Sequence, residues 1–293
     1  MKKKRGLDAV ALSKIIVATD FSIASKRLVM YAALIARRYK SKLYLTHIIP
    51  SDTYNSVPTE VMTEALKQTQ EKVREEMAYL QRLDCLKDLQ FETLIQEGEV
   101  APVLLRLAIE HEVSLVVLGT RGHRGLDRLL QGSVAEKVFR MASCPVLIVP
   151  PSDKTEAVAV PIRTILYPTN FSEKSLRAAP YALSLAKRHR ARLILLHILE
   201  EGEIKSRDDM ARLSLPVEER LRELMPDAPS RGILAFVEFG PVEKRVLRVA
   251  WENHAGIIVL GIGAAGPAAA HLEEGITYRI VREAPCPVFT TRS

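Results

Sequence analysis

Residue types that suit phosphate binding gather in one short stretch of the chain. Residues 119–133 read GTRGHRGLDRLLQGS and hold four glycines, three arginines and one histidine. Gly119 and Gly122 allow the backbone to approach a ligand closely, because no Cβ intervenes. Gly132 and Ser133 directly precede an amphipathic stretch, and a helix N-terminus offers unpaired N–H groups that favour phosphate. The stretch therefore predicts a phosphate-binding loop.

Other side chains in the same half of the sequence could add sites for a sugar and a base. Three apolar runs end at Ala18-Thr19-Asp20, at His47-Ile48 and at Leu118-Gly119. Ligands of open α/β sheets bind beyond the carboxyl ends of the strands, so these ends would converge on one site. There Asp20 would accept hydrogen bonds from ribose hydroxyls, and the backbone near Ile48 would face an adenine edge.

Each of these features also has a structural interpretation. Ser133 and Glu136 have the spacing of a capping box, which by itself only begins a helix. Glycines after a strand often only form a turn. Taken singly, the features favour structure, and taken together they favour a phosphorylated ligand. His47 and His197 end equivalent strands of separate domains without a cysteine or carboxylate cluster, so we expect hydrogen-bonded histidines and no metal site.

The chain contains an internal repeat. Two segment pairs match at an offset of 150 residues, 14–22 with 164–172 and 42–48 with 192–198. Two later pairs match at an offset of 142, 114–119 with 256–261 and 144–149 with 286–291. The second copy is therefore eight residues shorter between its second and third strands, a change that a surface connection tolerates.

Both copies alternate short β-branched runs with amphipathic stretches. The first copy predicts strands near 14–19, 42–48, 90–96, 114–119 and 145–149, and helices near 23–40, 59–83, 100–112 and 133–142. One helix face would hold Val73, Met77, Leu80 and Leu83. This alternation predicts an α/β protein with two tandem Rossmann-like domains, each a five-stranded parallel sheet flanked by helices.

The predicted domains span residues 1–150 and 163–293, and the proline-bounded segment 150–162 would link them. The last strand of each copy is short and apolar. An apolar edge strand invites pairing, and the nearest partner is the matching strand of the other copy. We therefore expect the two domains of one chain to form a pseudo-dimer that pairs through their last strands. A homodimer of two such chains is a further possibility.

Bulk composition is that of an ordinary soluble protein, with 47% hydrophobic and 26% charged residues among 293. Four of the net seven positive charges come from Lys2, Lys3, Lys4 and Arg5. Aromatic residues are 5% and are not interleaved with basic ones, which argues against nucleic acid as a partner. No apolar run approaches the roughly 20 residues of a membrane span. The three cysteines form no cluster, so we expect a reducing, cytoplasmic location.

The spacing from Gly119 to Ser133 resembles a family signature. Gly119, two residues, Gly122, nine residues and Gly132-Ser133 reproduce the G-x2-G-x9-G-[S/T] pattern of ATP-binding universal stress proteins. The segments VATDFS (17–22) and SCPVLIVP (143–150) are also similar to that family. The resemblance covers both copies and implies bound ATP or AMP, with Mg²⁺ a candidate companion of ATP.

The resemblance also implies roles for individual residues. Ala18, Thr19 and Asp20 would hold the ribose and base side, and Ile48 and Leu118 would flank adenine. The phosphates would be wrapped by Gly119, Gly122, Gly132, Ser133 and Val134, with Arg121 and His123 in the same loop.

The second copy lacks most of this chemistry. Asp20 corresponds to Asn170, Gly122 to Ala264, and Gly132-Ser133 to Glu274-Gly275, with a second acid at Glu273. A carboxylate close to a phosphate repels it unless a cation intervenes. We expect the second domain to bind no nucleotide, or to bind a smaller ligand poorly.

These observations favour a nucleotide-binding regulatory protein of the stress response, which acts on an unknown protein partner. No catalytic residue is identified. One alternative is an enzyme, either a slow ATPase or a relative of ATP-dependent ligases, although the segment TDFSIAS (19–25) lacks the serine-glycine-glycine loop and paired histidines of those ligases. The other alternative is an interaction scaffold that works without nucleotide.

Overall fold

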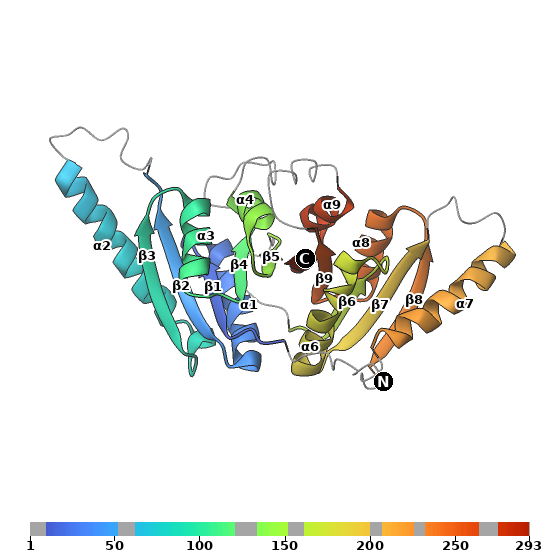
Figure 1. Ribbon diagram of the computed structural model, residues 1–293. Helices are drawn as coiled ribbons and strands as arrows, with labels where there is room; N and C mark the ends of the chain where they lie inside the picture. The colour runs from blue at the N-terminus through green and yellow to red at the C-terminus, as the bar shows by residue number, and fades with distance from the viewer. Residues whose placement is uncertain are drawn as a thin grey trace, which may run out of the picture. The chain divides into compact units, whose positions relative to one another are not determined.

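A computed structural model describes residues 10–51, 62–120, 134–151, 161–199, 207–225, 232–263 and 275–292 (Figure 1). The chain forms two compact units. The first lies within Leu12–Cys144, and the second combines Pro145–Pro150 with residues of Val160–Ser293. The last strand of the first repeat thus belongs to the unit of the second repeat.

The first unit is a parallel sheet flanked by helices. Its elements are β1 (Lys14–Ala18), α1 (Ile23–Tyr39), β2 (Lys42–Ile49), α2 (Met62–Gln81), η3 (Asp84–Leu86), β3 (Phe91–Glu97), α3 (Val100–Glu110), β4 (Leu115–Gly119) and α4 (Val134–Met141). The strands lie in the order β3-β2-β1-β4 and pair in parallel. The strand and helix ranges predicted from periodicity agree with these bounds to within a few residues, whereas the short helix η3 was not predicted.

The second unit repeats this plan. Its elements are β5 (Val146–Val149), β6 (Thr164–Pro168), α5 (Glu173–Leu176), α6 (Ala179–His189), β7 (Arg192–Leu199), α7 (Arg207–Glu223), β8 (Ile233–Phe239), α8 (Val242–Glu252), β9 (Ile257–Ile262), α9 (Ile276–Glu283) and β10 (Val288–Arg292). Its strand order is β5-β10-β9-β6-β7-β8. All neighbours pair in parallel except β5 and β10, which are antiparallel. The predicted pairing of the two last strands is confirmed.

The eight-residue difference falls where the repeat predicted it. β3 begins 42 residues after the end of β2, whereas β8 begins 34 residues after the end of β7. A second difference lies in the first helix, which is continuous as α1 but divided into α5 and α6 in the second repeat. Pro180 takes the place of Met30 there, and its ring clashes with the carbonyl of the residue four positions earlier, Leu176, where α5 ends.

The core lies between the strands and the helices that flank them. Ile15, Ile16 and Val17 of β1 are fully buried, as continuous apolar strands covered on both faces require. On the predicted apolar face of α2, Val73, Met77 and Leu80 are buried, and Leu83, just beyond the helix end, is half-buried. Each such side chain contributes roughly 1.5–3 kcal/mol when it leaves water.

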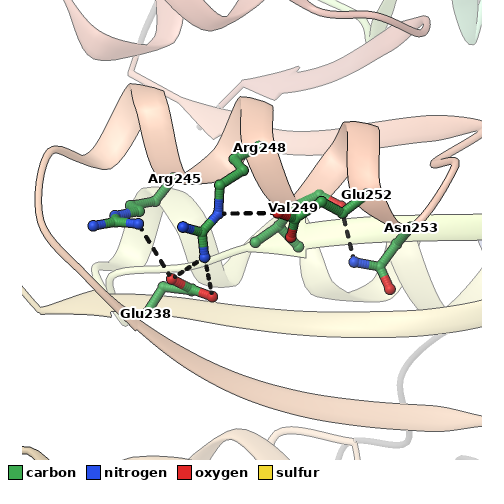
Figure 2. A network of polar contacts seen from close by, with 6 residues as sticks. All are labelled: Glu238, Arg245, Arg248, Val249, Glu252 and Asn253. Atoms are coloured by element: carbon green, nitrogen blue, oxygen red, sulfur yellow. Dashed lines mark hydrogen bonds and ion pairs between the residues drawn. The ribbon is translucent and has the colours of Figure 1, made fainter.

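Equivalent polar contacts fasten a helix to the outermost parallel strand in each repeat. In Figure 2 the Arg248 guanidinium of α8 donates to both carboxylate oxygens of Glu238 on β8, each at 3.1 Å. Its Nε also lies 3.4 Å from Glu252. The first repeat places Arg106 of α3 against Glu110 at 2.8 Å and Gln96 at 3.5 Å. The scaffold around the sheet is thus duplicated in detail.

The turn before these helices needs glycine in both repeats. Gly98 and Gly240 have φ angles of 140° and 117°. Residues with a Cβ rarely adopt such φ angles. The turns from β3 to α3 and from β8 to α8 therefore share a backbone conformation that favours glycine.

Candidate functional site

The topology of the first unit places a reversal point beside β1. The chain runs outward from β1 to β2 and β3, then returns to β4 on the other side of β1. Ligands of open α/β sheets bind outside the carboxyl ends of the strands at this kind of position. The last paired residues of β1 and β4 are Val17 and Val117, and Asp20 and Thr120 each lie three residues further along. Both residues therefore follow the carboxyl ends of the two strands that flank the reversal point.

The turn from β1 to α1 is held by hydroxyl groups. Thr19 is buried, and its Oγ1 accepts from the N–H of Phe21 at 3.0 Å and lies 2.9 Å from the Ser25 hydroxyl. Ser22 caps α1 by accepting from the N–H of Ser25 at 3.1 Å. Phe21 adopts a left-handed conformation with φ of 63°. These contacts fix the position of the intervening Asp20.

Only one oxygen of the Asp20 carboxylate is engaged by the turn. Oδ1 accepts from the N–H of Ser22 at 3.1 Å and from its hydroxyl at 2.6 Å. Oδ2 is buried and has no hydrogen-bond partner within the described part of the chain. A buried polar atom without a partner costs roughly 1–3 kcal/mol, and more when it carries charge. The carboxylate therefore offers an acceptor to a donor supplied from outside the turn.

His47, at the end of β2, braces the same turn. Its Nδ1 lies 2.8 Å from the Thr19 carbonyl oxygen, and because a carbonyl can only accept, Nδ1 carries the proton. The ring stacks on Phe21 with centroids 4.3 Å apart. Burial lowers the pKa of His47 below its usual value, against opposing effects of the Thr19 carbonyl and Asp20. His47 is therefore neutral at neutral pH, and it forms the hydrogen bond that its position at a strand end predicted.

The structure describes seven of the twelve predicted site residues. Ala18 ends β1, Thr19 and Asp20 follow it, Ile48 lies in β2, Leu118 and Gly119 end β4, and Val134 begins α4. Arg121, Gly122, His123, Gly132 and Ser133 lie outside the described residues. Thr120, which also lies in the glycine-rich stretch, was not among the predicted site residues, and the structure places it directly after β4.

The second repeat preserves the turn with different chemistry. Thr169 Oγ1 lies 2.9 Å from the Ser175 hydroxyl and accepts from the N–H of Phe171 at 3.0 Å, and His197 Nδ1 donates to the Thr169 carbonyl at 2.8 Å. An amide, Asn170, replaces the carboxylate and accepts from a backbone N–H at 3.1 Å. Because these distances match those of the first repeat, the two turns share these hydrogen bonds and differ in the side chain at the aspartate position.

A cation also covers the aromatic ring of the second turn. The Arg220 guanidinium lies 4.1 Å from the centroid of the Phe171 ring, whose centroid lies 4.9 Å from that of His197. The Arg220 guanidinium therefore lies within cation–π distance of the Phe171 ring.

The glycine at the end of the fourth strand has a packing role in the second repeat. A Cβ on Gly261, which corresponds to Gly119, would lie 2.0 Å from the Lys174 carbonyl oxygen. Glycine is required there because the backbone of α5 approaches β9 closely. The Lys174 side chain extends further, so that its Nζ would lie 3.2 Å from a Cβ on Gly263. A glycine at this position therefore does not by itself indicate a ligand.

Two further findings concern the described residues as a set. They contain no group of three or more histidine, cysteine, aspartate or glutamate side chains that could hold a metal ion. Among their helices, none combines the length and apolar character needed to cross a membrane.

Comparison with known proteins agrees with this architecture. Residues 12–150 and 161–292 each match the model of the universal stress protein family. The chain is 26% identical over 291 residues to a universal stress protein of Mycolicibacterium smegmatis. This alignment covers 95% of this chain and 96% of the relative. It is 30% identical over 137 residues to the universal stress protein MJ0531 of Methanocaldococcus jannaschii, covering 46% of this chain and 81% of that one.

A solved structure shares the fold over almost the whole chain. The crystal structure of a universal stress protein from Archaeoglobus fulgidus superposes with a TM-score of 0.70 at 20% identity, covering 97% of this chain and 99% of that chain. The chain therefore belongs to the universal stress protein family and carries one copy of the family's domain in each repeat.

Proposed function

We propose that the first repeat binds an adenine nucleotide, ATP or AMP, and that the protein acts as a nucleotide-dependent regulator in a stress response. The observation that carries this proposal is the buried, unpartnered Oδ2 of Asp20 at the reversal point of the sheet. An acceptor in this position suits the hydroxyl groups of a ribose. The glycines and arginines of residues 119–133 support the proposal, because they supply close backbone approach and positive charge for phosphates.

The site favours binding over catalysis. Asp20 is the only carboxylate that the turn from β1 to α1 contributes. It can accept a hydrogen bond from a hydroxyl or help to bind Mg²⁺ beside ATP. The turn supplies no second carboxylate for acid–base catalysis. His47 is neutral and uses its protonated nitrogen within the fold. Nucleotide binding would regulate the binding of a protein partner by favouring one conformation over another. The size of this shift equals the difference in the free energy with which the nucleotide binds the two conformations.

Calorimetric titration of the full chain with ATP and AMP tests the proposal. Asp20→Asn should weaken binding of both nucleotides about tenfold or more, because the amide cannot replace a charged acceptor and every 1.4 kcal/mol is a factor of ten. The matched control is Asn170→Asp, which places a carboxylate on the equivalent turn and should leave affinity and stoichiometry unchanged.

The outcomes separate the candidate functions. Mass spectrometry of small molecules released from the purified protein identifies the nucleotide and its ratio to the chain. Failure to bind either nucleotide below millimolar concentration would contradict the proposal and favour a scaffold. Steady release of ADP from ATP that is lost in Asp20→Asn, with the fold retained, would favour the slow ATPase.

A further inference from the structure

A second buried polar atom at the same strand ends has no partner. The hydroxyl of Thr120, directly after β4, forms no hydrogen bond to any described residue, although the residue is only 6% exposed. Leaving a hydroxyl unpaired in a buried position costs roughly 1–3 kcal/mol. Thr120 follows β4 and Asp20 follows β1, each three residues after the last residue pair of these two neighbouring parallel strands, and Asp20 Oδ2 is also unpartnered among the described residues.

The second repeat shows that packing does not require this hydroxyl. Thr120 corresponds to Ile262 at the offset of 142, and Ile262 is 4% exposed at the end of β9. The register of the two repeats is the same, because Ile16 pairs with Val116 and Leu166 pairs with Ile258. An apolar side chain therefore satisfies the same buried position. The hydroxyl is present only in the repeat that also keeps the aspartate.

We propose that Thr120 is a ligand-binding residue of the first repeat, which donates its hydroxyl hydrogen to a phosphate oxygen of the nucleotide. This inference rests on the proposed function. It follows from donor and acceptor types, because of the two unpartnered groups only the Thr120 hydroxyl can donate a hydrogen bond to an anionic oxygen. Asp20 Oδ2 can only accept, so it takes a sugar hydroxyl, whereas the Thr120 hydroxyl can donate to an anionic oxygen.

The two residues together set the direction of the ligand. The sugar lies over the end of β1, and the phosphate nearest to the sugar lies over the end of β4. The chain continues from Thr120 into the residues Arg121–Ser133, whose composition suits the remaining phosphates. Thr120 therefore contributes to the binding of a nucleotide and not to that of its nucleoside, which lacks phosphate. Asp20 contacts the ribose, which both ligands contain.

Titrations of the full chain with AMP and with adenosine test this assignment. Thr120→Val removes the hydroxyl and keeps the shape of the side chain, and it should weaken AMP binding about tenfold while adenosine binding changes less than twofold. Asp20→Asn should weaken the binding of both ligands. Without ligand, Thr120→Val should melt at the same temperature as the wild type or higher, because the mutation removes an unpaired buried hydroxyl.

The matched control is Ile262→Thr, which introduces a buried hydroxyl into the second repeat. It should lower the melting temperature and leave AMP affinity unchanged. Unchanged AMP affinity in Thr120→Val would overturn the assignment while wild-type binding upheld the proposed function. Equal losses for AMP and adenosine would overturn the direction of the ligand, and a less stable Thr120→Val would show that the hydroxyl has a partner within the fold. Absence of wild-type binding to both ligands would overturn the proposed function and this inference together.

Discussion

Single residues on a shared scaffold distinguish the two repeats. Thr19 and Thr169 make the same contacts at the same distances, and so do the histidines that brace them. Among the described residues, two of the changes fall at the carboxyl ends of strands, Asp20 to Asn170 and Thr120 to Ile262. Because the threonine and histidine contacts of the turn match in the two repeats, these substitutions change the polar groups at the strand ends without changing those contacts.

His47 makes the stability of the first unit depend on pH. Its pKa is lowered by burial, whereas in the unfolded chain it returns to about 6.5. Between those two values the unfolded state binds more protons. Stability is therefore complete above about pH 6.5 and falls as the pH drops through the folded pKa. We expect urea unfolding to show this loss between pH 7 and pH 5.

The variant His47→Gln should give a flatter profile over the same range, because glutamine does not titrate. An NMR titration of the His47 ring provides a direct check. A midpoint above 6.5 would reverse the sign of the expected pH dependence. The ion-paired carboxylates Glu92 and Glu112, whose pKa values are lowered by Lys42 and Lys14, titrate below this window and do not mimic the effect.

At the scale of elements, apolar periodicity and turn residues predicted most of what the structure shows. The strands and helices of the first repeat appear where alternation placed them, because burial on both faces of a parallel sheet leaves a clear apolar run. The division of the first helix in the second repeat was not predicted, although Pro180 was visible in the sequence. The hydrogen-bonding state of Asp20 and Thr120 could not be predicted, because it depends on atoms brought together from separate strands.

Close contact between α5 and β9 explains Gly261, the counterpart of the glycine that the sequence analysis placed in the phosphate site, Gly119. Gly261→Ala places a methyl group 2.0 Å from a backbone carbonyl oxygen of α5, so the helix must move. Overpacking of this kind costs roughly 1–3 kcal/mol, and we expect urea denaturation to show a loss of at least that size.

The substitution Lys244→Ala on the exposed face of α8 is a suitable control, which should change stability by less than about 0.5 kcal/mol. AMP affinity should remain at the wild-type value in both variants. A Gly261→Ala protein as stable as the wild type would show that α5 can shift without cost. The same packing role for Gly119 would then lose its support.

At the scale of the whole molecule, the two repeats share a pair of antiparallel strands but differ in the polar groups at their strand ends. The last strands β5 and β10 pair with each other, so the second unit completes its sheet with a strand from the first repeat. The Thr290 hydroxyl adds a hydrogen bond to the Val146 carbonyl at 3.2 Å across this pair. The second repeat can thus keep the scaffold and this pairing while it loses the aspartate and the threonine hydroxyl of the first.

This division predicts that nucleotide protects one repeat only. Hydrogen exchange measured with AMP at about 100 times its Kd should slow exchange in β1, β4 and the start of α1, because binding then stabilises the native state by about 2.7 kcal/mol. The equivalent segments β6, β9 and α5 form an internal control, and their exchange should not change. Stoichiometry should be one nucleotide per chain. Protection of β6 and β9 equal to that of β1 and β4 would mean that an amide and an isoleucine serve the ligand as well as the carboxylate and hydroxyl do, and the asymmetry of the two repeats would then have no role in binding.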